Sequence, residues 1–267
     1  MHRNTSPFSL IILSTFVAFI GLFTGCQSPT KSENEWRTVF EISQGKETGT
    51  YPEVIQYYQE LCDHFDNLSI HQGDTTDSGR PLHVVIYQPA GSPKIEQNKP
   101  PDLPVILINN GIHPGESDGI DASMMLLRDW ALNPEKGPQN FAVAIIPVYN
   151  IGGALNRNSF SRTNQNGPRA YGFRGNAQNY DLNRDFIKAD TRNALAFSQL
   201  FQWLRPLAFV DTHVSNGADY QYVLTHLMTQ HDKLSGAQGK FLQNQFTPAL
   251  EQALAAQSWP ITPYVNV

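Results

Sequence analysis

A histidine and a glutamate lie three residues apart in the segment Asn109–Glu116, which reads N-N-G-I-H-P-G-E. The segment follows the apolar run Pro104–Ile108, which is typical of a buried strand. His113 and Glu116 are therefore predicted to lie on a tight turn at the carboxyl end of that strand, the edge at which open α/β sheets bind ligands. Together they can supply two of the three protein ligands that a catalytic zinc ion needs.

The third ligand is expected at the end of another strand. The apolar run Leu207–Asp211 leads directly into Thr212 and His213, and a polar loop follows. Two histidines and one glutamate leave one coordination position for water, which distinguishes a catalytic zinc site from a structural one. Taken singly, each residue also has a simpler interpretation, as a solvated turn residue or as a hydrogen-bonded histidine.

A polar loop further along the chain carries groups that can hold a carboxylate. The segment Gly172–Phe186 reads G-F-R-G-N-A-Q-N-Y-D-L-N-R-D-F. Arginine forks and an asparagine amide suit bidentate capture of a carboxylate, and a nearby aspartate can accept the second ring N–H of a ligating histidine. The residues concerned are Arg174, Asp181, Asn183 and Arg184. A solvated loop with ordinary surface pairs is the alternative interpretation.

The elements that would position these residues alternate between strands and helices. Helices are predicted over residues 51–65, 120–130, 190–204 and 240–257, with Pro248 interrupting the last. Strands are predicted over residues 68–71, 82–88, 105–109, 141–147, 207–211 and 220–225, the last four of them buried. A long and functional loop is expected over residues 150–181. The pattern indicates a three-layer α/β/α fold with a mixed, mostly parallel central sheet.

Composition and charge limit the classes of protein to consider. The chain has 267 residues, of which 40% are hydrophobic and 16% charged, and its net charge is -5. This suits one globular domain or two small ones. Without a basic face, no nucleic-acid partner is expected. A disulfide framework is excluded, because there are only two cysteines and one of them is assigned to a lipid below.

The N-terminus is predicted to be a targeting segment. A short apolar run over residues 8–23 ends in small residues, which indicates a signal peptide over residues 1–25. Its end, L-F-T-G-C, resembles a bacterial lipobox, which implies lipidation of Cys26 and a membrane anchor at the bacterial cell envelope, on the outer membrane or the periplasmic face. A secreted protein and an uncleaved anchor are the alternatives. Residues 26–49 would be a tether and N-terminal extension, and residues 50–267 the catalytic domain.

Four segments, in order, resemble the zinc carboxypeptidases of the carboxypeptidase A type. They are S-G-R-P-L-H-V-V-I at 78–86, G-I-H-P-G-E at 111–116, D-L-N-R-D-F at 181–186 and V-D-T-H at 210–213. The resemblance covers roughly residues 50–226. The spacing from Arg174 to Asn183 and Arg184 is similar to that in the bacterial and cytosolic branch of the family.

The resemblance implies a zinc site and a peptide substrate. One zinc ion would be bound by His113, Glu116 and His213, and it would lower the pKa of a bound water. Asn183 and Arg184 would hold the free C-terminal carboxylate of the peptide. The implied activity is that of a metallocarboxypeptidase.

Further roles follow from the same resemblance, and one role has no residue. Arg174 would polarise the scissile carbonyl and stabilise the developing oxyanion, and Asp181 would orient His113. The family also uses a glutamate general base that comes well after the third zinc ligand. Only Glu251 follows His213, and its helical context does not match the family's motif.

The missing base leaves three explanations open. The chain is a fragment of a longer peptidase with an incomplete sheet, which we favour, or an inactive relative, or a protein that uses another base. An incomplete sheet would expose an apolar strand edge. Two other functions also remain open. One is a zinc-dependent deacylase of N-acyl amino acids, similar to the succinylglutamate desuccinylase and aspartoacylase branch, which shares H-x-x-E and D-L-N-R. The other is an envelope module that binds zinc or peptide without turnover.

Overall fold

The computed structural model describes residues 33–215, 217 and 220–264. The chain divides into two compact units, residues 1–36 and 37–267. In the first unit, one short 3-10 helix, η1 (Glu33–Trp36), is described. The predicted signal peptide and Cys26 lie outside the described residues. No helix in the described part of the chain is both long enough and apolar enough to cross a membrane.

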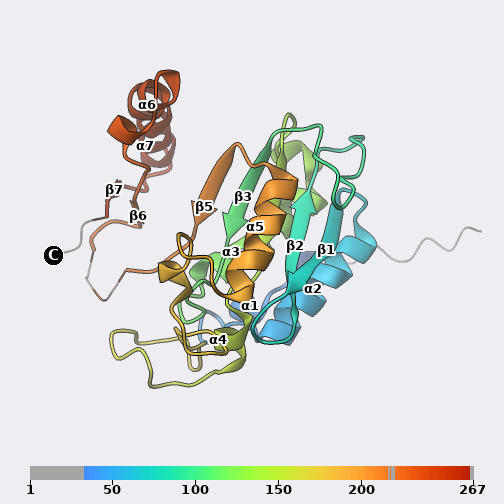
Figure 1. Ribbon diagram of the computed structural model, residues 1–267, viewed down its shortest axis with the longest axis vertical. Helices are drawn as coiled ribbons and strands as arrows, with labels where there is room; N and C mark the ends of the chain where they lie inside the picture. The colour runs from blue at the N-terminus through green and yellow to red at the C-terminus, as the bar shows by residue number, and fades with distance from the viewer. Residues whose placement is uncertain (1–32, 216, 218–219, 265–267) are drawn as a thin grey trace, which may run out of the picture. The chain divides into compact units, whose positions relative to one another are not determined.

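A five-stranded mixed sheet forms the centre of the second unit (Figure 1). Its strands are β1 (Leu68–Thr75), β2 (Pro81–Tyr87), β3 (Val105–Asn109), β4 (Ala142–Ile146) and β5 (Ala208–Asp211). They are arranged in the order β1-β2-β4-β3-β5. β2 is antiparallel to both β1 and β4, whereas β4, β3 and β5 are parallel. The prediction of a mixed, mostly parallel sheet is confirmed, because β2 alone opposes the direction that these strands share.

Helices cover both faces of this sheet. The main ones are α2 (Tyr51–His64), α3 (Asp118–Leu132) and α5 (Arg192–Leu204). Figure 1 shows α5 across one face, where Leu200 and Leu204 join a buried cluster that includes Leu107. Side chains alternate between the two faces of a strand. On the other face, the Tyr87 ring packs against Trp130 of α3, with centroids 5.3 Å apart. The predicted α/β/α layers therefore surround β2, β3 and β4.

Shorter elements lie between the main ones. They are α1 (Val39–Ile42), η2 (Pro134–Lys136), α4 (Ile151–Leu155) and η3 (Leu182–Arg184). The predicted long loop, residues 150–181, contains α4 and a single β-bridge between Asn158 and Tyr171. The Arg157 guanidinium donates hydrogen bonds to the carbonyls of Thr48 and Gly49, which ties the loop to the segment that precedes α2.

Two predicted buried strands differ from those observed. β5 is an exposed edge strand, with 39% of Phe209 and 46% of Val210 accessible. Among the described strands it pairs with β3 alone, so its second edge is uncovered. Of the run 220–225, only Leu224 and Thr225 lie in a strand, β6 (Leu224–His226). This strand pairs with β7 (Ile261–Pro263) instead of the main sheet. An apolar run predicts strand conformation, but it does not specify the partner strand or what covers the faces.

The remaining C-terminal residues are helical. The elements are η4 (His231–Lys233), α6 (Ala237–Phe241), the π-helical turn η5 (Leu242–Phe246) and α7 (Thr247–Ala255). The predicted helix over 240–257 is thus observed as two α-helices joined by a π turn. Pro248 is the second residue of α7, directly after the π turn, so the change of helix type occurs beside the residue that cannot donate a backbone hydrogen bond.

Candidate metal centre

The turn between β3 and α3 carries His113 and Glu116, as predicted. The chain leaves β3 through Gly111, whose φ of +66° is one that glycine adopts readily. The Glu116 N–H donates to the carbonyl of His113 at 2.8 Å and closes the turn. Both side chains are only 2% exposed. The turn therefore holds the histidine and the carboxylate together in the interior, next to the first turn of α3.

His213 reaches the same place from β5. In the parallel pairing of β3 with β5, Asn109 is the partner of Asp211. Beyond that pair, the Thr212 N–H donates to the Asn109 carbonyl at 3.0 Å, and the Thr212 hydroxyl donates to Asn110 Oδ1 at 2.9 Å. These contacts fix the end of β5 against the end of β3, and they bring His213 beside the turn.

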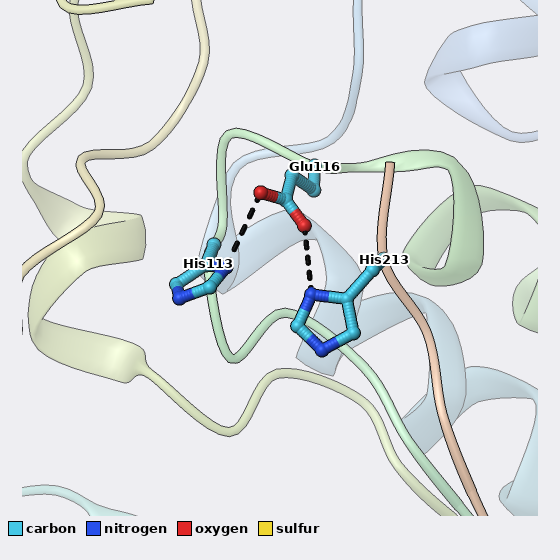
Figure 2. Close-up of side chains that lie close together, drawn as sticks. All are labelled: His113, Glu116 and His213. Atoms are coloured by element: carbon cyan, nitrogen blue, oxygen red, sulfur yellow. Dashed lines mark hydrogen bonds and ion pairs between the residues drawn. The ribbon is translucent and has the colours of Figure 1, made fainter. Parts of the chain in front are cut away.

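The three predicted ligands converge in one cluster (Figure 2). One ligand atom from each of His113, Glu116 and His213 lies within 4.8 Å of the others. His113 Nδ1 lies 3.2 Å from Glu116 Oε1, and His213 Nδ1 lies 3.0 Å from Glu116 Oε2. Two imidazole nitrogens and a carboxylate at this spacing could hold a metal ion, and this is a donor set that zinc accepts.

Asp181 and Arg174 lie beside His113. The Nε2 atom of His113 is 3.0 Å from Asp181 Oδ1, and the Arg174 guanidinium donates to Asp181 Oδ2 through Nε at 3.0 Å. Arg174 Nη1 lies 4.0 Å from Glu116 Oε1, and the arginine side chain is 40% exposed. The aspartate is thus placed to orient the His113 ring, and the arginine is placed at the accessible border of the cluster.

Asn183 and Arg184 follow Asp181 on η3. Asp181 Oδ1 accepts a hydrogen bond from the Asn183 N–H at 3.0 Å, which starts this short helix. The Arg184 guanidinium donates to the Asn183 carbonyl at 2.8 Å and is exposed. Both side chains are therefore in the loop that contacts His113. The binding of a carboxylate by these two side chains stays a prediction. Glu251, which follows His213 in the sequence, is an exposed residue of α7.

Two further residues contact the cluster that the sequence did not single out. Arg162 is 9% exposed, and its Nη2 lies 3.0 Å from Glu116 Oε1. Asp211 Oδ2 lies 2.9 Å from His213 Nε2. The spacing D-x-H contained the signal for Asp211, because residues i and i+2 of a strand point to the same side. No local pattern marks Arg162, which belongs to the long irregular loop.

The electrostatics of the metal-free cluster follow from these contacts. Burial raises the pKa of Glu116, but the hydrogen bonds to His113 and His213 outweigh it and hold that pKa well below the ordinary value. Burial lowers the pKa of His213, but its contacts with Asp211 and Glu116 raise the net value to about 9. The pKa of Asp181 is lowered, because its contacts with His113 and Arg174 exceed the effect of burial. The carboxylates are therefore ionised at neutral pH, as metal binding requires.

The fold is similar to that of solved structures, although the sequence identities are low. No protein-family model and no curated protein matches the sequence. Among solved structures, a protein from Burkholderia mallei described as a carboxypeptidase has a TM-score of 0.57 and 18% identity, over 79% of this chain and 50% of that one. Bovine thrombin-activatable fibrinolysis inhibitor, in complex with tick carboxypeptidase inhibitor, has a TM-score of 0.55 and 12% identity, over 82% and 77%.

A third structure of the same fold is the carboxypeptidase A of Helicoverpa armigera. Its TM-score is 0.51 at 15% identity, over 80% of this chain and 57% of that one. The present chain thus spans about half the length of the Burkholderia mallei structure. At these identities the likeness concerns the fold: the chain has the fold of the zinc carboxypeptidases.

Proposed function

We propose that His113, Glu116 and His213 bind one zinc ion, and that the site belongs to a metallocarboxypeptidase that acts on the C-terminal residues of peptides. The observation that carries the proposal is the convergence of the three ligand atoms within 4.8 Å from the ends of two strands. The second nitrogen of each imidazole is held by a carboxylate, an arrangement common around histidines that ligate metals. A bound zinc ion would supply Lewis-acid chemistry and lower the pKa of water.

The substrate-facing roles are assigned to residues of the long loop and η3. Arg174 is 40% exposed beside the cluster, where its guanidinium can donate to the carbonyl oxygen of a bound peptide. We assign Asn183 and Arg184 to the free C-terminal carboxylate, because a planar guanidinium and an amide suit bidentate capture. No residue is assigned as the general base.

The metal assignment is tested by counting zinc in purified protein. The parent should bind one zinc ion per chain, and His113→Ala and His213→Ala should lose it. His64→Ala, an exposed histidine at the end of α2, is the matched control and should keep it. Full zinc retention in both site variants would contradict the assignment.

The substrate assignment is tested with peptide pairs that differ only in a free or amidated C-terminus. The parent should bind the peptide with the free carboxylate more tightly than the amidated peptide, and Arg184→Ala should remove that difference in affinity. Arg192→Ala, an exposed arginine on α5, should not. Hydrolysis of N-acyl amino acids with no action on peptides would instead identify a deacylase. Peptide binding without turnover would fit a binding module, and it would equally fit a peptidase chain that lacks its general base.

We also propose that Cys26 carries a lipid that holds the protein at the bacterial cell envelope. The proposal is supported by the apolar run that ends in L-F-T-G-C. Radiolabelled fatty acid should be incorporated into the protein expressed in a Gram-negative host. Cys26→Ser should remove the label and release the protein from membranes. A parent protein that carries no label would contradict the proposal.

A further inference from the structure

The two histidines of the cluster have matching surroundings. Each presents Nδ1 to Glu116, and each places Nε2 against a different aspartate, at 3.0 Å for His113 with Asp181 and 2.9 Å for His213 with Asp211. Of these two aspartates, the resemblance implies a role for Asp181 alone. We propose that Asp211 is a positioning residue that fixes the ring orientation and tautomer of His213, so that Nδ1 is free to bind the metal. This inference rests on the proposed zinc site.

The backbone places Asp211 for this contact. Asp211 is the last residue of β5, and His213 follows at the i+2 position, on the same side of the extended chain. Thr212 points to the other side, where its hydroxyl donates to Asn110 Oδ1. The spacing D-x-H at a strand end therefore puts a carboxylate directly beside the imidazole.

Asn109 fixes the aspartate in turn. It is fully buried at the end of β3, and its Nδ2 donates to Asp211 Oδ1 at 2.8 Å. This bond occupies one carboxylate oxygen and leaves Oδ2 for His213 Nε2. The side-chain oxygen of Asn109, Oδ1, has no hydrogen-bond partner among the described residues. The side-chain amide of Asn109 therefore bonds Asp211 through its N–H group only. β3 thus supports all three ligands, two through the turn that follows it and one through the Asn109–Asp211 bond.

His213 has more need of such a partner than His113 has. The His213 side chain is 35% exposed, whereas that of His113 is 2% exposed and held by packing. A protonated Nε2 that donates to a carboxylate leaves the lone pair on Nδ1 and makes that nitrogen a stronger donor to a metal. Without Asp211, the ring could rotate or bind through the wrong nitrogen.

The first test measures zinc affinity by competition with a chromophoric chelator. Asp211→Ala should weaken binding about 10- to 100-fold, the range that follows loss of a partner of this kind. Asp181→Ala should weaken it by a similar factor. Asp211→Asn should lose less, because the amide oxygen can still accept from Nε2. Asp63→Asn, an exposed charge change on α2, is the control and should match the parent.

The second test observes the histidine itself. In the zinc-loaded parent, proton NMR with nitrogen-15 labelling should show a slowly exchanging, low-field Nε2–H signal for His213. Asp211→Ala should lose this signal and keep that of His113, and Asp181→Ala should do the reverse. The inference would be overturned if Asp211→Ala bound zinc as tightly as the parent and kept the His213 Nε2–H signal. A parent chain that binds no zinc would instead overturn the proposed function, so the two failures are distinguishable.

Discussion

The candidate metal centre has two halves that the fold supports in different ways. The core half is His113 and Glu116, on the turn after β3, and both side chains are 2% exposed. The edge half is Asp211 and His213, at the end of β5, where the side chains are 19% and 35% exposed. Burial and the contacts with Arg162 and Asp181 hold the core half, whereas hydrogen bonds to β3 hold the edge half.

The position of each strand in the sheet explains the difference. β3 lies between β4 and β5, and every residue of β4 is buried. β5 pairs with β3 alone among the described strands, and most of its residues are exposed. A site that spans both strands therefore depends on how well β5 keeps its register against β3. Substitutions in the two halves should accordingly differ in their effects on folding and on metal binding.

The largest expected contrast concerns the charged contacts of Glu116. Arg162→Met removes a buried partner at 3.0 Å and should lower the free energy of unfolding of the metal-free protein by about 3–5 kcal/mol. His213→Gln removes a more exposed partner and should cost about 1 kcal/mol or less. Chemical denaturation of both variants, with zinc removed, measures this. Equal losses would show that the edge half is as firmly held as the core half.

The same contrast explains what the sequence could and could not predict. The core half is local: an apolar strand, a turn with glycine and proline, and a His and a Glu three residues apart suggest a ligand pair, although the same residues taken alone also fit a solvated turn. The roles of Asp181 and Arg174 follow from a resemblance, and both residues lie beside His113 in the structure. The ligand pair comes from contiguous residues, whereas these two roles come from the order of separate motifs.

The sequence failed where burial and pairing depend on distant residues. The run 207–211 is apolar enough for a buried strand, yet β5 is the exposed apolar edge that an incomplete sheet would leave, because among the described strands only β3 pairs with it. Arg162 contacts Glu116 from a loop without periodicity, so no spacing links the two residues. The apolar run places Asp211 only at the end of a strand, although its position two residues before His213 carries a usable signal.

Apolar side chains of β3 and β5, the two strands that carry the metal centre, should also differ in their contribution to stability. Leu107 of β3 is fully buried, and Leu107→Ala should cost about 2–5 kcal/mol of unfolding free energy through lost burial and a cavity. Val210 of β5 is 46% exposed, and Val210→Ala should cost about 1 kcal/mol or less. Urea denaturation with a common slope checks both values. A loss of several kcal/mol for Val210→Ala would mean that β5 is covered in solution.

The free energy of unfolding should depend on pH through Asp121, which lies on the helix that follows the core half. Asp121 of α3 is 4% exposed, and burial raises the pKa of its carboxyl from 3.8 to about 6, although a hydrogen bond from Thr48 opposes the shift. Between these two pH values the native state binds more protons than the unfolded state, so stability should fall as pH rises from 3.8 to about 6.

Asp121→Asn should remove that dependence, because asparagine does not titrate and can still accept from Thr48. The free energy of unfolding of the parent should fall by up to about 3 kcal/mol across this interval relative to the variant. Denaturation at several pH values measures the difference, with Asp63→Asn as the exposed control. A parent and variant with parallel pH profiles would show that Asp121 titrates normally.

The smallest expected effects come from two glycines, one packed against each half. A Cβ on Gly115 would approach Arg162 Cδ to 2.6 Å and the Gly172 carbonyl oxygen to 2.8 Å, and a buried backbone atom cannot move far. Gly115→Ala should therefore cost about 1–3 kcal/mol of stability. A Cβ on Gly119 would overlap Thr212 Oγ1 and lie 2.5 Å from Thr212 Cβ, so the backbone at the end of β5 would have to move.

Gly119→Ala should consequently cost at least as much stability as Gly115→Ala, because a displaced Thr212 loses its hydrogen bonds to Asn109 and Asn110. We expect about 1–3 kcal/mol of stability to be lost, together with displacement of His213 from Glu116 and a measurable weakening of zinc binding. Unfolding measurements without metal and zinc competition with metal would give both quantities for each variant. If the zinc affinity of Gly119→Ala stayed at the parent value, the end of β5 would accommodate the added Cβ without moving His213. The geometry of the site would then not depend on the hydrogen bonds that join Thr212 and Asp211 to β3.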